Sequence, residues 1–291
     1  MRTLTTTQLH ELGGPITLAD DLLIEADADT VLPLLPDGAF ELIYIDPPFN
    51  TGRVQRSRRI TTRRHEAGDR TGFGGRRYAS TARSDIAYAD SFEDYAGFLA
   101  PKLARARDLL SAEGTLYVHL DYREAHYVKV TLDEIFGRDC FLNEIIWAYD
   151  YGAKPTRRWP SKHDTILVYV RDRERHHFDA QAVEREPYMA PGLVGPEKAA
   201  RGKRPTDTWW HTIVPTNGSE RTGYPTQKPE GVLRRIVSAS SLPGGWCLDF
   251  FAGSGTLGAV AAQLGRHYVL VDSNPEAIAI ARARLGAAAK P

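Results

Sequence analysis

The sequence predicts an α/β protein built around an open sheet. Short runs of apolar, β-branched and aromatic residues, such as 42–45 and 267–271, alternate with segments whose apolar residues recur at helical spacing. The first of these runs ends at Asp46 and the second at Asp272, and a glycine-rich turn joins another strand to a helix. Carboxylates and glycines at strand ends indicate a ligand site, because open α/β sheets bind ligands at the carboxyl ends of their strands.

The N-terminal half contributes the first strands and helices. We expect an irregular lead-in over 1–20, because this stretch is polar and contains Gly13-Gly14-Pro15. The later elements predicted in this half are a strand over 22–26 that ends at Asp27, a helical turn over 30–35, a strand over 42–45, a helix over 91–110, a strand over 115–120, a helix over 124–136, and strands over 143–149 and 165–170.

The α/β alternation is most regular from residue 224 onward. Helices are predicted over 231–241, 257–264 and 275–285, and strands over 246–250 and 267–271. We therefore divide the chain into an N-terminal part of the main domain (1–149), an insertion (150–223) and a C-terminal part (224–291). Within the insertion, only the strand over 165–170 is expected to belong to the scaffold.

One stretch, 50–78, lacks the apolar residues that a core needs. It carries nine arginines against Glu66 and Asp69, so we expect a long mobile loop. Arginine without lysine favours contact with phosphate groups. We therefore predict that this loop binds nucleic acid, although a solvated surface loop explains the same composition.

Composition excludes several other classes of protein. The formal net charge is zero over 291 residues, so no global basic field marks a polyanion-binding protein. Cys140 and Cys247 follow neither a metal-ligand nor a redox spacing, and no metal is expected. We find no signal peptide and no apolar run long enough for a membrane span, and the reducing cytoplasm is the expected compartment.

The segment Asp46-Pro47-Pro48-Phe49 is the first motif. The two prolines end the strand, since the first has no N–H and the second holds its neighbour extended. A carboxylate, a stiff carbonyl and an aromatic ring then project from the strand's carboxyl end. This set suits the exocyclic amino group of a flat heterocycle.

The second motif joins a strand to a helix at 248–256. Gly253, Gly255 and Gly258 form G-x-G-x-x-G, and Asp272 ends the next strand. This pattern is the dinucleotide fingerprint, so a nicotinamide oxidoreductase is one alternative. Asp249 favours another cofactor, because a strand-end carboxylate suits an ammonium and a sulfonium group. S-adenosylmethionine carries both groups and no pyrophosphate.

Together the two motifs resemble the amino-methylating DNA methyltransferases of the β group, in which the catalytic motif precedes the cofactor motif. Tyr224-Pro225-Thr226-Gln227-Lys228-Pro229 is similar to the segment that this family carries just before its cofactor motif. The resemblance implies a doubly wound, mostly parallel sheet of seven strands with one antiparallel strand, and S-adenosylmethionine as the methyl donor. It also implies that 150–223 is a target-recognition region.

The resemblance also assigns roles to individual residues. Asp46, Pro47, Pro48 and Phe49 would be catalytic, acting on a base that has been flipped out of the duplex. The acid of the N-terminal strand end would approach the cofactor's adenine, and Asp272 its ribose. The residues implied in cofactor binding are Asp27, Thr226, Gln227, Lys228, Pro229, Asp249, Phe250, Phe251, Ala252, Gly253, Ser254, Gly255, Thr256, Asp272 and Ser273.

The target base and the class of substrate stay open at this point. Aspartate at the head of the motif resembles the enzymes that methylate adenine N6, whereas cytosine N4 enzymes of this group more often carry serine. Asp46 also speaks against an RNA or protein methyltransferase, since those enzymes typically place asparagine before Pro-Pro. Methylation of a ring carbon is rejected, because neither cysteine lies on the catalytic edge. A non-catalytic nucleic-acid-binding protein is a further alternative.

The expected partner is double-stranded DNA. A homodimer and a cognate restriction endonuclease, as in restriction–modification systems, are partners that the sequence leaves open. The residues predicted to contact DNA are Arg53, Arg56, Arg58, Arg59, Arg63, Arg64, Lys154, Arg157, Arg158 and Lys162.

Overall fold

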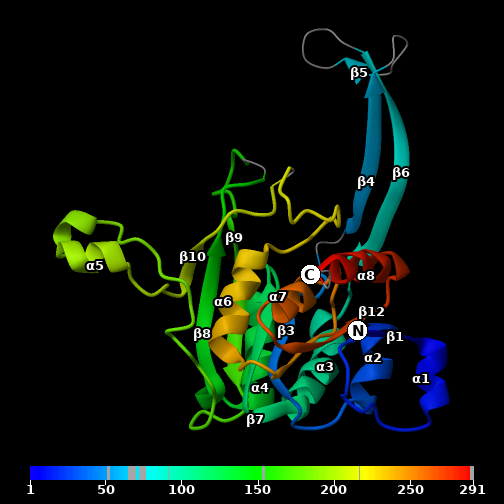
Figure 1. Cartoon of the computed structure of the whole chain (residues 1–291), viewed down its shortest axis with the longest axis horizontal. Helices are drawn as coiled ribbons and strands as arrows, with labels where there is room; N and C mark the ends of the chain where they lie inside the picture. Colours follow the sequence, from blue (N-terminus) through cyan, green and yellow to red (C-terminus); the bar gives the residue numbers. More distant parts are fainter. Residues whose placement is uncertain are drawn as a thin grey trace.

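The computed structural model describes residues 1–50, 53–64, 70–71, 77–90, 92–152, 155–215 and 217–288 (Figure 1). Its centre is a sheet with the strand order β1-β2-β12-β11-β3-β7-β9-β8-β10. These strands are β1 Arg2–Thr5, β2 Leu22–Glu25, β3 Phe40–Ile45, β7 Leu110–Leu120, β8 Phe141–Ala148, β9 His163–Val170, β10 Thr208–Trp210, β11 Trp246–Asp249 and β12 His267–Asp272.

Seven of these strands, from β2 to β8 in the spatial order, form the mostly parallel sheet that the resemblance implies. β9 pairs antiparallel with both β7 and β8, while the other neighbours in this sheet run parallel. Strands β1 and β10 extend the sheet by one strand at each edge. The predicted α/β class and its single antiparallel strand are therefore confirmed.

Helices cover both faces of the sheet. Along β3, Ile43 and Ile45 belong to one buried apolar cluster, and Leu42 and Tyr44 belong to the other, because successive side chains of a strand point to opposite faces. Helices α3 and α4 pack on the first face, and α6, α7 and α8 on the second (Figure 1). The helices are α1 Thr6–Leu12, α2 Ala28–Val31, α3 Tyr95–Leu109, α4 Ala125–Phe136, α5 Pro196–Arg201, α6 Glu230–Ser240, α7 Thr256–Gln263 and α8 Pro275–Ala288. Within the described ranges, no helix has the length and apolarity that crossing a membrane requires.

The strand directions place the two sequence motifs at one edge of the sheet. β3, β11 and β12 are parallel, so Asp46, Asp249 and Asp272 all lie at their carboxyl ends. β8 runs in the same direction, because both β7 and β8 are antiparallel to β9. The segment 149–162, which joins β8 to β9, therefore also emerges at this edge, which we call the site edge.

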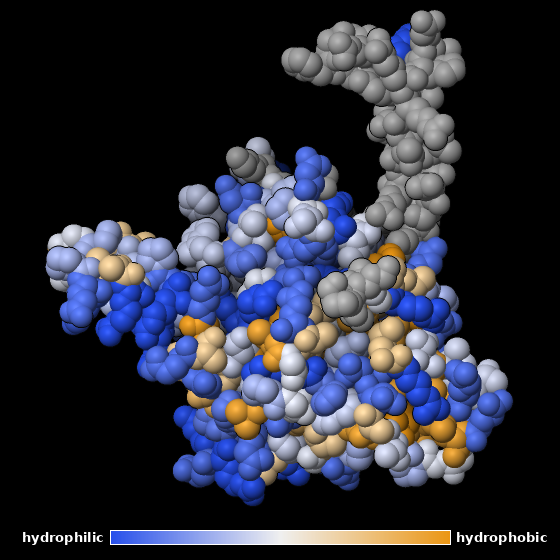
Figure 2. Space-filling model, viewed as in Figure 1, coloured by the Kyte–Doolittle hydropathy of each residue, from blue (hydrophilic) through white to orange (hydrophobic). Residues whose placement is uncertain are grey.

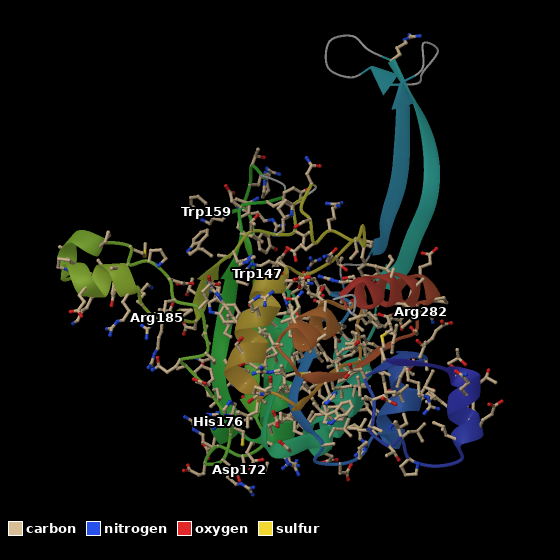
Figure 3. All side chains as sticks on the ribbon, viewed as in Figure 1. Trp147, Trp159, Asp172, His176, Arg185 and Arg282 are labelled. Carbon is tan, nitrogen blue, oxygen red and sulfur yellow. The ribbon has the colours of Figure 1, made fainter. Side chains whose placement is uncertain are left out.

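The proposed insertion starts at the site edge but does not stay there. β9 ends at Val170 on the opposite edge, where Asp172 and His176 lie, far from Trp159 (Figure 3). The chain then forms an arm that carries α5 and returns through β10 to the site edge, and hydrophilic side chains gather along this arm (Figure 2). Only its two ends, 149–162 and the segment after Trp210, therefore lie beside the motifs.

The prediction of an irregular lead-in over 1–20 is wrong for residues 2–12, whereas 13–20 form no helix or strand. β1 pairs with β2, and α1 follows it directly. Thr5 and Gln8 form a capping box at the start of α1, and Gly13 ends the helix in the left-handed conformation. Leu4 and Leu9 are buried by this arrangement, although the stretch is polar overall.

The prediction of a mobile loop over 50–78 is also wrong for its described part. β4 (Arg53–Arg64) pairs antiparallel with β6 (Arg77–Asp90), and β5 (Arg70–Thr71) pairs with β6 as well. Backbone pairing between β-favouring residues lets this stretch form regular strands although it lacks the apolar residues of a core. We call 53–90 the arginine hairpin. The predicted start of the next helix, Ser91, lies outside the described residues; α3 begins at Tyr95, and Asp94 caps it.

Candidate functional site

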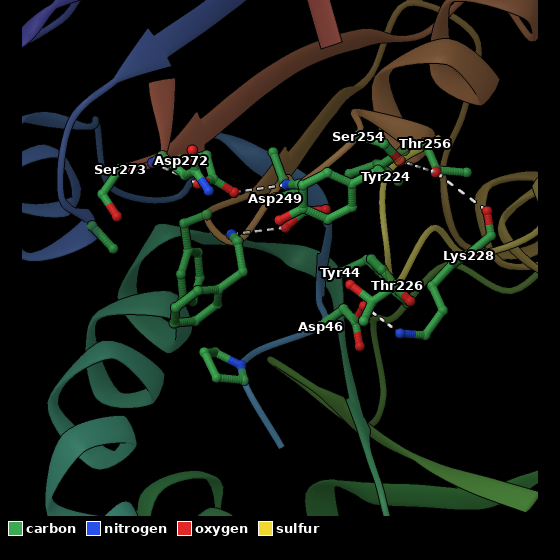
Figure 4. A pocket seen from close by; sticks show the side chains of 18 of the residues that line it. Tyr44, Asp46, Tyr224, Thr226, Lys228, Asp249, Ser254, Thr256, Asp272 and Ser273 are labelled. Atoms are coloured by element: carbon green, nitrogen blue, oxygen red, sulfur yellow. Dashed lines mark hydrogen bonds and ion pairs between the residues drawn. The ribbon is translucent and has the colours of Figure 1, made fainter. Parts of the chain in front are cut away.

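A cavity of about 320 Å³ lies at the site edge and brings the two motifs together (Figure 4). Its walls come from the ends of β2, β3, β11 and β12, from α3, and from the segment before α6. The residues that line it are Asp27, Ala28, Tyr44, Asp46, Pro48, Phe98, Lys102, Tyr224, Thr226, Gln227, Lys228, Asp249, Phe250, Phe251, Ala252, Gly253, Ser254, Thr256, Leu257, Asp272, Ser273 and Asn274.

The glycine-rich turn forms the floor of this cavity. Gly253 and Gly255 have φ angles of 49° and 70°, which favour glycine, and a Cβ on Gly255 would lie 2.9 Å from the Ala281 side chain. The N–H of Gly253 donates to Oδ2 of Asp272 over 2.8 Å, and the N–H of Asn274 donates to Oδ1 over 2.8 Å. Asp272 is thereby held in a fixed orientation toward the turn.

Burial dominates the electrostatics of the two strand-end carboxyls beside the turn. Loss of solvent raises the pKa of Asp249 well above its usual value, and the charges of Asp46 and Asp272 raise it further, although the N–H of Phe251 opposes the shift. Burial likewise raises the pKa of Asp272. A cationic ligand in the cavity would stabilise the charged form of both groups.

The catalytic candidate Asp46 faces the cavity from the end of β3. Lys228, from the segment before α6, donates from Nζ to Oδ2 of Asp46, and its ammonium lies 4.9 Å from the centre of the Phe49 ring. The hydroxyl of Thr256 donates to the carbonyl of Lys228 over 3.3 Å and so joins this segment to the glycine-rich turn. Oδ1 of Asp46 is buried, and among the described residues it has no hydrogen-bond partner. The carboxylate therefore has an acceptor atom free for another donor.

An aromatic wall closes the other end of the cavity. Phe98 from α3 lies 6.1 Å from Phe251, measured between ring centres. Lys102 extends past Phe98 to Asp29, with 2.8 Å between Nζ and Oδ2. Asp27 lines the same end and accepts a hydrogen bond from the N–H of Asp29. Two rings and a carboxylate suit a flat heterocycle that carries hydrogen-bond donors.

Most of the predicted site residues line this cavity, and a few do not. Pro47, Phe49, Pro229 and Gly255 lie outside its lining, although each belongs to a segment that forms it. Gln227 lines the cavity, and its amide also closes its own loop, donating to the carbonyl of Glu220 over 2.7 Å and accepting from the N–H of Thr222 over 2.8 Å.

Sequence reasoning missed several residues of the site. Tyr44 carries a signal that was available, because it precedes Asp46 by two positions on one strand and so points to the same face. Asn274 follows the strand-end Asp272 closely. Phe98 and Lys102 belong to a helix that lies far from both motifs in the sequence, and nothing in the sequence marks them.

Asn50 also went unnoticed, and it joins three segments next to the first motif. It has a positive φ of 54°. Its Nδ2 donates to Glu124 at the start of α4 over 2.8 Å, and its Oδ1 accepts from the N–H of Phe92 over 2.8 Å. One side chain thus ties together the two positions where the chain leaves for the arginine hairpin and returns from it.

The predicted DNA-contacting residues are only partly described. The backbone of Arg53, Arg56, Arg58, Arg59, Arg63 and Arg64 forms β4, and the side chains of these residues, like Lys154, lie outside the described part of the chain.

The basic residues of 149–162 that are described fall into two groups. Arg157 and Arg158 are exposed at the site edge, and Arg158 donates to the Tyr122 hydroxyl over 3.1 Å. Lys162 instead donates to the carbonyls of Tyr151 and Gly152 within its own loop.

The two cysteines take no part in this site. Cys247 is buried on β11, where burial raises the pKa of its thiol to about 12, and Cys140 precedes β8 at the opposite edge. Neither thiol faces the cavity. This agrees with the rejection of a cysteine nucleophile.

Comparison with known proteins gives one family. A family model described as DNA methylase, of the N6 and N4 methyltransferases, matches residues 40–283. The type II methyltransferase M.HpaI of Haemophilus parainfluenzae is 28% identical over 91% of this chain and 74% of its own length. The DNA adenine methyltransferase YhdJ of Escherichia coli K12 is 29% identical over 91% of this chain and 83% of its own.

Solved structures share the fold. The cytosine-N4-specific PvuII DNA methyltransferase superposes with a TM-score of 0.62 at 14% identity, covering 90% of this chain and 84% of that protein. The complex of M1.HpyAVI with S-adenosylmethionine gives 0.56 at 21% identity, covering 90% and 97%. At these identities the likeness concerns the fold.

Proposed function

This chain belongs to the DNA methylase family that acts at N6 or N4 amino groups, and on that basis we propose that it methylates the N6 amino group of adenine in double-stranded DNA. It is an α/β enzyme that uses S-adenosylmethionine. The observation that carries the proposal is the cavity in which the carboxylate of Asp46 and the glycine-rich turn of 253–255 face one another.

The residues around the cavity fit S-adenosylmethionine. Asp249 is buried and Asp272 is half-buried, and burial raises the pKa of both carboxyls; a ligand with ammonium and sulfonium groups would stabilise their charged forms. Asp272, already oriented by Gly253, would accept from the ribose hydroxyls. Asp27 with the aromatic wall would hold the adenine, and Thr226, Lys228 and the turn would surround the methionine part. When bound, this cofactor supplies an electrophilic methyl group.

The catalytic motif would hold the target base beside that methyl group. An amino group inside a duplex cannot reach this cavity, so the base must be flipped out. Phe49 would stack on the base, and Asp46 and the carbonyl of Pro47 would accept its amino hydrogens. The free acceptor atom of Asp46, Oδ1, supports this role. Catalysis would come from orientation and from oriented acceptors that keep lone-pair density on the amino nitrogen.

Adenine is favoured over cytosine by two observations. The first is Asp46 at the head of the catalytic motif. The second is the similarity to a protein named as a DNA adenine methyltransferase over 91% of this chain. The likeness to the cytosine-N4-specific PvuII enzyme supports the fold and carries no weight for the base.

The DNA-binding surface would lie at the site edge. The arginine hairpin leaves directly after Phe49, and 149–162 brings Arg157 and Arg158 to the same edge. Together with the segment after Trp210, these parts would contact the duplex around the flipped base. Target recognition would thus belong to both ends of 150–223, within the catalytic domain that 1–149 and 224–291 complete. A homodimer and a cognate restriction endonuclease stay predictions.

The test is transfer of a labelled methyl group from S-adenosylmethionine to unmethylated genomic DNA, followed by digestion to nucleosides. Label in N6-methyladenine is the expected result. Label in N4-methylcytosine would overturn the choice of base while leaving the family mechanism. A reaction in which RNA but not DNA is labelled would contradict the proposed substrate.

A further inference from the structure

Beneath the catalytic motif lies a buried chain of three polar side chains that the proposed mechanism does not use. The hydroxyl of Tyr44 lies 2.8 Å from Nδ1 of His119, and Nε2 of His119 lies 3.1 Å from Oδ2 of Asp164. Tyr44 belongs to β3, His119 to β7 and Asp164 to β9. The exposed fractions of these residues are 2%, 0% and 7%. The chain thus crosses three strands, and each of its members lies near the site edge.

The chemistry of this chain fixes the form of the imidazole. Burial by itself raises the pKa of Asp164, but the hydrogen bond from His119, together with the nearby charges and the hydroxyl of Tyr149, lowers it overall, so the carboxylate is charged. It accepts from Nε2–H of His119, and Oδ1 accepts from the Tyr149 hydroxyl over 2.9 Å. In the neutral imidazole, Nδ1 of His119 is then the acceptor for the Tyr44 O–H. Each link has one donor and one acceptor, and the ring cannot turn without breaking two hydrogen bonds.

The fixed ring lies against the catalytic motif. The centres of the His119 and Phe49 rings are 6.0 Å apart, with 33° between their planes. Tyr44, at the other end of the chain, precedes Asp46 by two positions and lines the same cavity. The His119 and Trp147 rings also meet edge to face, with 5.4 Å between their centres, and the Trp147 indole N–H donates to the carbonyl of His211, which follows β10 directly.

Stability alone does not account for a polar chain at this place. A buried hydrogen bond contributes little net free energy, because the unfolded chain bonds equally well to water. The same sheet contains a simpler buried pair, in which the hydroxyls of Tyr117 and Ser240 lie 2.7 Å apart. Tyr117 is the register partner of Tyr44 on the neighbouring strand, and it lies outside the lining of the cavity. The two tyrosines differ in one respect: Tyr44 is connected to the catalytic motif through His119, and Tyr117 is not.

We propose that His119 is a positioning residue: held by Tyr44 and Asp164, it sets the ring of Phe49 at the angle needed to stack on the flipped base. The proposal rests on the proposed function, since it assigns Phe49 to the base. His119 itself touches neither base nor cofactor in this account. Its effect is on the orientation of Phe49, and so on the fraction of bound complexes in which the amino group faces the methyl group.

The experiment compares Tyr44→Phe and Asp164→Asn with the matched control Tyr117→Phe. Each tyrosine variant removes one buried hydroxyl, and the two tyrosines lie on adjacent strands. Asp164→Asn keeps the shape but removes the charge and replaces one acceptor oxygen by a donor, so the side chain can no longer accept from both the Nε2–H of His119 and the Tyr149 hydroxyl. The target sequence is first mapped from the sites that the wild-type enzyme methylates. Single-turnover methylation is then measured at saturating DNA and S-adenosylmethionine.

A second readout follows the base itself, with 2-aminopurine at the target position. We expect Tyr44→Phe to lower the single-turnover rate at least fivefold and Asp164→Asn at least tenfold, with cofactor and DNA dissociation constants within threefold of wild type. The 2-aminopurine emission of the bound complex should rise in both, because a base that stacks poorly on Phe49 is quenched less. Tyr117→Phe should leave rate and emission within twofold, while its melting temperature falls by as much as that of Tyr44→Phe.

Three results would overturn the inference. One is a wild-type rate in Tyr44→Phe, and another is an equal loss of rate in Tyr117→Phe. The third is loss of rate with unchanged 2-aminopurine emission, which would mean that the chain acts on something other than stacking. Failure of the proposed function is distinguishable, because the wild-type enzyme would then methylate no adenine in DNA.

Discussion

The ammonium of Lys228 contacts two groups of the catalytic motif, the carboxylate and the aromatic ring, and we assign both groups to binding of the target base. It donates to Oδ2 of Asp46 and lies over the Phe49 ring at 4.9 Å from its centre. Both members of the ion pair are largely buried, with exposed side-chain fractions of 10% for Lys228 and 16% for Asp46. A base that stacks on Phe49 must displace the ammonium from the ring, whereas Oδ1 of Asp46 can accept its amino group while Oδ2 stays paired. Without a base, the pair keeps the buried carboxylate from lacking a counter-charge.

The first prediction concerns the free energy of this pair. Lys228→Met should lower the free energy of unfolding by about 2–3 kcal/mol, because it leaves a mostly buried carboxylate without its partner. Adding Asp46→Asn should recover more than about 1 kcal/mol of that loss in a double-mutant cycle. Urea unfolding of the wild type, the two single variants and the double variant measures this coupling energy.

A suitable control for this cycle is Arg175 with Glu113, an ion pair whose side chains are 59% and 51% exposed. Its coupling energy should stay below about 1 kcal/mol, since solvent screens exposed pairs. Equal coupling in the two cycles would contradict the buried character of the Lys228 pair.

The second prediction concerns pH and Asp249. Burial raises the pKa of Asp249 in the folded protein, so the folded state holds its proton more tightly than the unfolded chain does. The stability that this group contributes is present below the unfolded pKa of about 4 and is lost as pH rises through the folded pKa. Asp249→Asn should therefore raise the unfolding free energy at pH 7 by about 1 kcal/mol or more, with no gain at about pH 4.

The same carboxyl should make cofactor binding release protons. A cationic ligand favours the charged form of Asp249, so S-adenosylmethionine should bind more tightly as pH rises from the unfolded pKa of about 4 through the raised pKa of this carboxyl. Titration calorimetry in two buffers of different ionisation enthalpy counts the protons. Uptake of protons, or no proton change in this range, would refute the assignment of Asp249 to the cofactor.

The third prediction concerns the arginine hairpin and salt. Replacing Arg56 and Arg58 by glutamine should weaken DNA binding and reduce the slope of log K against log salt by about 2, because each phosphate contact contributes about 0.9. Arg138 and Arg175 provide a control of equal charge at the opposite edge of the sheet. Their replacement should leave the slope unchanged; equal effects of the two pairs would remove the hairpin from the interface.

Local signals in the sequence were enough to predict most of the scaffold. Apolar runs that stop at a carboxylate predict strands such as β3 and β12. Apolar residues at helical spacing and terminal glycines predict the helices between them. The lead-in over 1–20 was missed because its strand and helix are short and bury only a few residues. Its structure depends on pairing with β2, which periodicity within one segment does not reveal.

For the arginine hairpin, composition led to the wrong prediction of a loop. Composition correctly indicates that this stretch forms no core, but a ribbon held by backbone hydrogen bonds does not need one. The register sets Arg58 opposite Asp85 and Arg53 opposite Asp90, and both acids lie outside the stretch whose charge was counted. Most of β6, the strand that pairs with β4, lies beyond residue 78, so the composition of 50–78 alone could not indicate the pairing.

Within the site, motif residues could be found and their supports could not. Asp46, Asp249 and Asp272 lie at strand ends, and a proline or glycine follows each of them within four positions, which makes them strong local signals. Lys102 reaches the site through helix packing, and His119 gains its partners beneath the site through the register of neighbouring strands. Both depend on contacts between distant segments, for which a single sequence carries no spacing rule.

The central claim is that the Asp46 carboxylate accepts the amino group of the target base, and the most direct measurement is the single-turnover methylation rate of Asp46→Asn. This variant keeps the size of the side chain but replaces one acceptor by a donor. We expect at least a 100-fold loss of rate, with the dissociation constant for S-adenosylmethionine within threefold of wild type, while Asp108→Asn at the opposite edge keeps the wild-type rate. Methylation by Asp46→Asn within threefold of wild type would contradict the account.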